Sequence, residues 1–396
     1  MMLRPGTFAM TALLASLTGL GPLTVDMYLA SMPDISRTLA APAAQVQLTI
    51  SFYLVGFALG QMFYGPLSDR HGRRPVMLAA LGVYSLATLA CVLASSIELL
   101  IAARFCQAIG GAGTIVLARA VVRDLYDGTR IGRELSLMAS IMALAPIVAP
   151  LIGGVLQTAF GWRSNFMLLL AFGVLAATAV WLLFPETLRH RAPEPVSLLS
   201  TLRSYRSFLR HPSFVAHLGI GTCTFLGLFS WISTAAFVLQ DIYGLSPLGF
   251  GVAFAIGSAG YLVGTTIAAR VVTRWGIDRT IGVGCLGMAC GGIVMIVAVA
   301  LGLSLPTSLV LAMAIYLAGM GLVLPQAQAG ALLPFPQRAG AASSLMGVVQ
   351  QTSSAVLGAF LGHILGATAL PLAMSVAIVG CLALIAWALT RNIRVR

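Results

Sequence analysis

Apolar runs long enough to cross a lipid bilayer alternate with short charged gaps along almost the whole chain. A helix needs about 20 mostly apolar residues to span a hydrocarbon core of about 30 Å. Of the 396 residues, 59% are hydrophobic and only 9% are charged, whereas soluble domains carry roughly 25% charged residues. We therefore predict an all-α membrane protein rather than a soluble domain.

The apolar runs predict twelve spans in two sets of six, separated by the basic stretch 185–212. Equal lengths of 184 residues on either side of this stretch indicate a duplicated six-helix unit. We expect an N-terminal bundle over 1–184, a linker over 185–212 and a C-terminal bundle over 213–396. The predicted spans lie near residues 8–33, 44–67, 75–94, 98–120, 135–159, 164–184, 213–239, 247–269, 279–303, 306–328, 339–366 and 370–390.

The basic residues set the expected orientation. The net charge is +12, but the chain has no lysine and its arginines lie in the gaps between apolar runs, which argues against nucleic-acid binding. If the N-terminus is cytoplasmic, only Arg37 and Arg163 fall in external loops, as the positive-inside rule requires. We expect a multi-pass protein of the bacterial inner membrane with both termini and the linker in the cytoplasm. The linker, which holds Arg189 and Arg191, has a second interpretation as a patch for anionic lipid headgroups.

Enzyme and channel classes find little support. The six cysteines lie inside apolar stretches and indicate small buried hydrophobic side chains rather than disulfides or metal ligands. The five histidines are scattered and only one acid falls well inside a span, so no catalytic group, metal site or cofactor is expected. A channel would need a continuous polar pore.

One loop stands out after the second span, Gly65-Pro66-Leu67-Ser68-Asp69-Arg70-His71-Gly72-Arg73-Arg74-Pro75. Its glycines permit a tight turn, and Asp69 can accept hydrogen bonds from arginines or from the exposed amides of a neighbouring helix N-terminus. A solvated charged loop is the alternative. The segment 269–279 is an imperfect echo in the second half, with Thr273 in place of the acid.

Small residues mark the fifth span, where Pro146, Pro150, Gly153 and Gly154 fall within ten residues. Such a face lets helices approach closely, and we expect an opposing surface at Gly257, Gly260 and Gly264 of the eighth span. Ordinary close packing is the alternative.

Two ionisable groups other than histidine fall well inside spans, Asp26 in the first and Arg104 in the fourth. Each costs about 2.5 to 3.5 kcal/mol at a helix centre on insertion scales, so a shared polar cavity is the expected reason. An interfacial position is the alternative for Asp26. His363 could shuttle protons, although a bond to a backbone carbonyl is the more common role. Aromatic and amide candidates for the walls of a cavity are Tyr28, Tyr53, Phe229, Tyr261, Gln326 and Gln350.

These motifs resemble those of the major facilitator superfamily. The loop after the second span matches the signature G-x-L-x-D-R-x-G-R-R. The segment Val25-Asp26-Met27-Tyr28-Leu29-Ala30-Ser31-Met32-Pro33 is similar to the D-M-Y-L-P-x-x-P signature of the bicyclomycin and chloramphenicol/florfenicol exporter branch, with Ala30 in place of proline.

The resemblance implies a fold of two pseudo-symmetric six-helix bundles and export of small amphiphilic drugs in exchange for protons. Asp26 and Arg104 would be the functional pair, with Gln107 completing an R-x-x-Q-G pattern in which Ala108 replaces the glycine. The loop would latch the two halves on the cytoplasmic side with Asp124 as a partner, and the fifth span would carry the antiporter signature. Expected partners are a small-molecule substrate, protons and the lipid bilayer, with a monomeric chain. Export of an endogenous metabolite, such as a siderophore, sugar or amino acid, is the alternative.

Overall fold

The computed structural model describes residues 7–126, 129–188, 198–303, 305–366 and 368–394, and every regular element among them is a helix. The chain divides into two compact units, Met1–Val196 and Ser197–Arg396. This boundary falls inside the predicted linker 185–212, whose Arg189 and Arg191 lie outside the described residues. The two units are described separately below.

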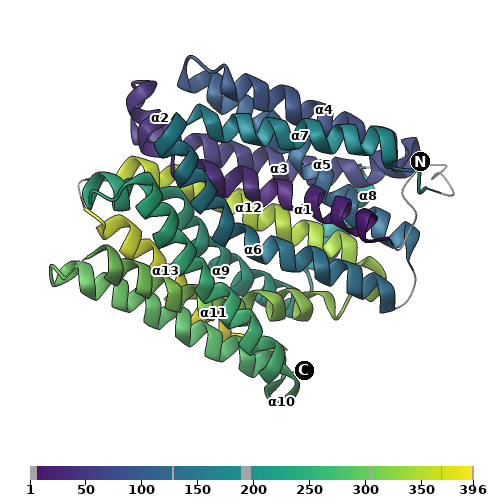
Figure 1. Cartoon of the computed structure of the whole chain (residues 1–396). Coiled ribbons are helices and arrows are strands. Elements are labelled where there is room, and N and C mark those ends of the chain that lie inside the picture. The colour runs from purple at the N-terminus through teal and green to yellow at the C-terminus, as the bar shows by residue number, and fades with distance from the viewer. Residues whose placement is uncertain (1–6, 127–128, 189–197, 304, 367, 395–396) are drawn as a thin grey trace. The chain divides into compact units, whose positions relative to one another are not determined.

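The first unit holds seven described helices (Figure 1). Among them α3 and α5 share the most extensive contact, α4 packs on α5 and α7, and α1 packs on α6. Small residues make the α3–α5 contact close, since a methyl group on Gly56 would lie 2.5 Å from the carbonyl oxygen of Phe105. The helices are α1 (Phe8–Leu29), α2 (Met32–Thr38), α3 (Ala43–His71), α4 (Arg73–Val92), α5 (Ile97–Leu125), α6 (Thr129–Phe160) and α7 (Arg163–Leu183).

The second unit begins with α8, which lies in the predicted linker and packs on α9 and α12. Its elements are α8 (Leu198–Leu209), α9 (Pro212–Phe237), the short π-helix η1 (Val238–Ile242), α10 (Pro247–Ala300), α11 (Pro306–Leu332), the 3₁₀ turn η2 (Pro336–Arg338), α12 (Ala339–Ile364), α13 (Leu370–Leu389) and α14 (Arg391–Arg394).

The eighth and ninth predicted spans are joined in one element, α10. Only Gly276 departs from helical geometry within it, with φ 75° and ψ 171°, a region that is essentially restricted to glycine. The gap expected between 269 and 279 is therefore a single-residue break.

Twelve spans are accounted for in the described part of the chain. Ten helices are long and apolar enough to cross a membrane, and α10 is counted once among them although Gly276 divides it. The remaining span is α6, whose apolar part is the shorter stretch Leu144–Phe160. The predicted fold class, an all-α membrane protein with twelve spanning helices, is confirmed.

One detail of the sequence prediction is wrong, and a second contact is more specific than expected. Cys106 and Cys290 are exposed on the surface of the chain rather than buried. Gly260 and Gly264 press against the backbone carbonyls of Ala314 and Ala318 on α11, while Gly257 has no neighbour within 4 Å of a Cβ position. Gly260 and Gly264 therefore lie in the α10–α11 contact, and the expected contact with the fifth span stays a prediction.

Candidate functional site

A fully buried cation lies at the centre of the first unit. The side chain of Arg104 on α5 is 0% exposed. Its Nη1 atom donates to the backbone carbonyl of Thr24 at 3.2 Å and to Oε1 of Gln107 at 2.7 Å, and Nε2 of Gln107 donates to Thr88 at 2.8 Å. This chain of hydrogen bonds fixes Arg104 between α1, α4 and α5.

Aromatic rings surround the same guanidinium group. Its carbon lies 4.7 Å from the ring centroid of Tyr28, 4.4 Å from that of Tyr53 and 5.7 Å from that of Phe166. Cation–π contacts contribute about 2 kcal/mol or more when they are desolvated, which offsets part of the cost of burying the charge. The Nε and Nη2 atoms of Arg104 and the hydroxyl of Tyr53 have no hydrogen-bond partner in the described structure, so this cage has donors left for a ligand.

Asp26 lies on α1 with 5% of its surface exposed. In the described structure Asp26 forms no ion pair with Arg104, whose partner on α1 is the carbonyl of Thr24, two residues before the acid. Among the described residues, Asp26 has no ion pair and no hydrogen-bond partner for its carboxylate. A carboxylate without a compensating partner in an apolar interior is stabilised by taking up a proton or by binding a donor.

The helix that packs against α1 beside Asp26 carries the predicted small-residue motif. A side chain on Gly153 of α6 would collide with the backbone carbonyl of Met27. The amide of Asn165 on α7 donates to the hydroxyl of Ser31 at 2.8 Å and to the carbonyl of Gly153 at 3.3 Å. Pro146 and Pro150 lie inside the continuous helix α6, and Gly154 is buried. Close packing of α6 therefore fixes the backbone next to Asp26.

Arg73 is the hub of the charged junction between α3 and α4. Its guanidinium donates to Asp69 at 2.5 Å, to the hydroxyl of Ser68 at 2.5 Å, and to Asp124 of α5 at 2.8 and 3.4 Å. Arg73 is buried while Asp69 is 44% exposed. The glycine roles differ from expectation, because α3 continues to His71 and Gly65 is helical, so the turn falls on Gly72 alone. Arg70 is exposed.

Asp69 accepts from an arginine, one of its two expected kinds of partner, while the helix amides that were the other kind bind Glu186, which the sequence analysis missed. The carboxylate of Glu186 lies just beyond α7 and accepts from the backbone N–H of Arg73 at 2.9 Å and of Arg74 at 3.1 Å, at the first turn of α4. It also accepts from the N–H groups of Thr187 and Leu188, and the Thr187 hydroxyl donates to Asp124 at 3.3 Å. The segment after α7 is thus tied to the Arg73 hub. The partners of Glu186 are mainly backbone amides, which every residue except proline carries, so no sequence pattern predicts this contact.

The model of the Major Facilitator Superfamily matches residues 14–359. The chain belongs to this superfamily. Like its other members it is a membrane transporter and not an enzyme, and the family resemblance read from the sequence motifs is confirmed.

Curated superfamily relatives align over most of the chain. It is 33% identical to the "Uncharacterized MFS-type transporter YdgK" of Bacillus subtilis, over 89% of this chain and 88% of that protein. It is 32% identical to "Multidrug resistance protein D" of Escherichia coli, over 87% and 86%. It is 30% identical to the "Bicyclomycin resistance protein homolog" of Haemophilus influenzae, over 92% of each.

Solved superfamily structures share the fold. A bacterial homolog of the human lysosomal transporter Spinster, inward-facing and unoccupied, aligns with a TM-score of 0.73 and 19% identity over 98% of each chain. The xylose transporter XylE of E. coli, in a partially occluded inward-open conformation, aligns with a TM-score of 0.75 and 15% identity over 97% of each chain. At these identities the likeness shows the fold alone.

The predicted cavity residues of the second unit of this facilitator come from four different helices and differ in burial. Gln350 on α12 is buried and its Nε2 atom has no partner in the described structure, whereas Gln326 and Tyr261 are half-buried. Phe229 packs on Phe225 with ring centroids 4.9 Å apart. His363, an exposed side chain, places Nδ1 2.8 Å from the carbonyl oxygen of Ala359 on its own helix.

Proposed function

We propose that this facilitator is a proton-coupled antiporter that exports small amphiphilic drugs, bicyclomycin- or phenicol-like, across the bacterial inner membrane by alternating access. The observation that carries the proposal is Asp26, a buried carboxylate on α1 with which no cation in the described part of the chain pairs. The names of two relatives, a multidrug resistance protein and a bicyclomycin resistance protein homolog, support drugs as the substrate class.

Asp26 is the proposed coupling site because keeping its carboxylate ionised in a buried position costs free energy. An isolated ionised carboxylate in an apolar environment is strongly disfavoured, so the group binds either a proton or a substrate that offers a cation or a hydrogen-bond donor. Proton and substrate then compete for one carboxylate. If the transporter changes conformation only when the carboxylate binds a proton or the substrate, it exchanges protons for substrate across the membrane.

Arg104 and Gln107 are proposed to hold the cavity in place for this exchange. The hydrogen bonds to Thr24 and Gln107 use one nitrogen of the guanidinium, which leaves Nε and Nη2 as donors. Tyr28 and Tyr53, packed on its faces, are proposed as aromatic walls for the substrate. A substrate carbonyl could therefore bind Arg104 while a donor group on the same molecule binds Asp26.

The charged junction around Arg73 is proposed as the cytoplasmic gate. Arg73 pairs with Asp69, whose side chain is 44% exposed, and with the less exposed Asp124. A pair with an exposed carboxylate contributes only about 0 to 1 kcal/mol. Such contacts can open and close within a transport cycle. The proposed gate also includes Gly65, Arg70 and Gly72. The helix proposed to support it is α6, which carries Pro146, Pro150, Gly153 and Gly154.

The proposed arrangement is a monomer with two six-helix bundles, 1–184 and 213–396, joined by a cytoplasmic basic linker over 185–212. Both termini are proposed to be cytoplasmic. The support is the distribution of arginines, of which only Arg37 and Arg163 fall in the external loops of this topology.

Inverted membrane vesicles carrying a pH-sensitive fluorescent dye test the proposal. After acidification of the lumen by respiration, addition of bicyclomycin, chloramphenicol or florfenicol should release protons in vesicles with the protein and not in vesicles without it. A siderophore, a sugar and an amino acid serve as the comparison set. Proton release by the metabolites alone would contradict drug export, and release by no compound would contradict antiport.

A further inference from the structure

Exposed arginines gather where α10 breaks at Gly276, and the proposed transport site uses none of them. Arg270, Arg274 and Arg279 lie within six residues of this glycine, and all three are exposed. Among the described residues they have no hydrogen-bond or ion-pair partner. The side chain of Trp275, which lies between them in the sequence, is 41% exposed. We call these three arginines and Trp275 the basic corner.

The acid that pairs with the loop arginine of the first unit has no equivalent in the basic corner. In the first unit Arg73 pairs with Asp69, whereas Thr273 stands at the equivalent position of the second. Asp278 is the only acid in the segment 269–279, and Arg394 binds it, with Nη2 2.7 Å from Oδ1. The arginines of the basic corner therefore keep their positive charge without an acidic partner in the part of the chain that the structure describes.

An exposed apolar stripe leads along α10 to the first two of these arginines. Val263 and Ile267 are exposed and lie seven and three residues before Arg270, and Arg274 follows one turn later. Residues that are three, four or seven positions apart share one face of a helix. These four side chains therefore line one face of the predicted eighth span, and they change from apolar to basic toward the break.

The helix after the break has the same pattern in reverse. Val283 and Leu286 are exposed and lie four and seven residues after Arg279, on its face of the helix. In a membrane protein such apolar stripes are accommodated by lipid tails, which are as apolar as leucine. The predicted spans end at residue 269 and resume at residue 279, so the basic corner lies at the level of the lipid headgroups, where tryptophan is also enriched.

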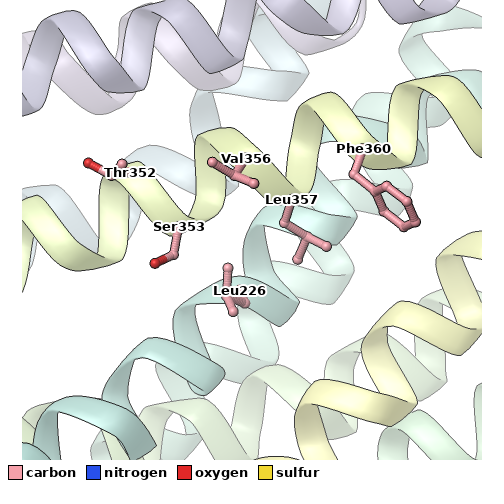
Figure 2. A pocket seen from close by; sticks show the side chains of 6 residues that line it. All are labelled: Leu226, Thr352, Ser353, Val356, Leu357 and Phe360. Atoms are coloured by element: carbon pink, nitrogen blue, oxygen red, sulfur yellow. The ribbon is translucent and has the colours of Figure 1, made fainter.

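The groove between α9 and α12 in the same unit lacks this combination of charge and apolar surface (Figure 2). It is lined by Leu226, Thr352, Ser353, Val356, Leu357 and Phe360. Because no charged side chain lines it, this groove does not distinguish an anionic ligand from a neutral one. The basic corner does, since guanidinium groups bind phosphate oxygens through paired N–H donors.

We propose that the basic corner binds the headgroup of an anionic phospholipid such as phosphatidylglycerol. The guanidinium groups bind the phosphate, and the ring of Trp275 packs on the glycerol backbone and the upper part of the acyl chains. A soluble phosphate would pair with the arginines but leave Trp275 and the apolar stripes without a contact. The proposed topology assigns the site to the cytoplasmic leaflet, but the lipid contact itself does not depend on proton-coupled export.

Native mass spectrometry of the purified full-length protein in detergent, titrated with phosphatidylglycerol or phosphatidylcholine, tests the proposal. Each arginine near an anionic lipid surface strengthens binding about fivefold. Arg270→Gln combined with Arg274→Gln should therefore raise the Kd of the first bound phosphatidylglycerol by about 20-fold. Phosphatidylcholine, whose choline cation cancels the phosphate charge, should bind the parent more weakly, and its Kd should stay nearly the same in the variant.

A matched control removes the same charge elsewhere in the second unit. Arg206→Gln combined with Arg210→Gln changes two exposed arginines at the end of the predicted linker and should leave the Kd for phosphatidylglycerol nearly unchanged. Equal affinity of the parent for the two lipids, an unchanged Kd in the corner variant or an equal rise in the control would overturn the proposal. Displacement of phosphatidylglycerol by equimolar glycerol 3-phosphate, which has no acyl chains, would also overturn it and identify a soluble phosphate as the occupant. No transport is measured, so the result is independent of the vesicle assay.

Discussion

Replacing Glu186 with glutamine should destabilise the first unit at the start of α4. The carboxylate accepts two amides of that helix, at 2.9 and 3.1 Å. Hydrogen bonds to a charged group contribute about 1.5 to 3 kcal/mol, and an anion at a helix N-terminus about 0.3 to 1 kcal/mol. Glutamine keeps one acceptor oxygen, and water at this exposed site screens the charge of the carboxylate. We therefore expect the free energy of unfolding to fall by about 1 to 2 kcal/mol. For a unit of roughly 200 residues this lowers Tm by about 2 to 8 °C.

The pH dependence of that loss identifies its cause. Partial burial raises the pKa of the Glu186 carboxyl, but four backbone N–H donors, of Leu188, Arg73, Arg74 and Thr187, outweigh burial and hold the pKa below its ordinary value. A lowered pKa stabilises the folded state above the ordinary value, and this contribution disappears as the pH falls through the folded pKa. The Tm difference between parent and Glu186→Gln should therefore be full at pH 7 and shrink in acid.

Thermal unfolding of detergent-solubilised protein, followed by a thiol-reactive fluorophore, measures this difference. Glu98→Gln is the control, because Glu98 is exposed in the first turn of α5 and hydrogen-bonds only locally, with Ser96 and its own backbone. Its change in Tm should be smaller than that of Glu186→Gln. Equal Tm values for parent and Glu186→Gln at pH 7, or a difference that grows in acid, would refute the assigned role of the carboxylate.

Three further variants probe close contacts by transport and thermal unfolding. Gly72→Ala places a side chain at φ 101° and ψ 154°, a conformation that costs about 1 to 3 kcal/mol for other residues, so Tm should fall. Gly153→Leu forces a side chain into the carbonyl of Met27 and should abolish transport at normal expression. Arg394→Gln removes two bonds to Asp278, at 3.0 and 2.7 Å, and should lower stability by about 3 kcal/mol, because it leaves a partly buried acid unpaired.

Each variant has a counterpart that should change little. The control for Gly72→Ala is Gly82→Ala inside α4, where no atom lies within 4 Å of the Cβ position. The control for Gly153→Leu is Leu151→Ala, two residues away on α6. The control for Arg394→Gln is Arg391→Gln, which removes an exposed arginine from α14. A greater loss of transport in Leu151→Ala than in Gly153→Leu would mean that this face of α6 does not pack on α1. If Gly82→Ala lowers Tm as much as Gly72→Ala, or Arg391→Gln as much as Arg394→Gln, the stabilising role assigned to Gly72 or to Arg394 is wrong.

The fold was predictable because membrane insertion depends on hydropathy, which one sequence displays directly. Length and apolarity located the twelve spans within a few residues at most ends, and arginine-bearing gaps separated them. The exceptions have local causes. Gly276 interrupts α10 at a single position, and α3 continues six residues beyond Gly65 because Pro66 is tolerated inside the helix.

The contacts between helices were less predictable because they depend on which faces meet. Gly260 and Gly264 were correctly marked as close-packing residues, but only the coordinates show that α11 is their neighbour. Arg104 and Asp26 were chosen as buried charges, yet the guanidinium binds the carbonyl of Thr24, a group that every residue carries and no sequence pattern distinguishes. Glu186 was missed for the related reason that its partners are backbone amides.

The most direct test of the central claim is pH-gradient-driven uphill export by Asp26→Asn in inverted vesicles, at parental expression. Asparagine keeps the shape of the carboxyl group and part of its hydrogen bonding but cannot release a proton. The account predicts that uphill export is abolished, while downhill exchange of a neutral substrate such as chloramphenicol persists. Uphill export at the parental rate would contradict the account and transfer the coupling role to another group, with His363 the next candidate.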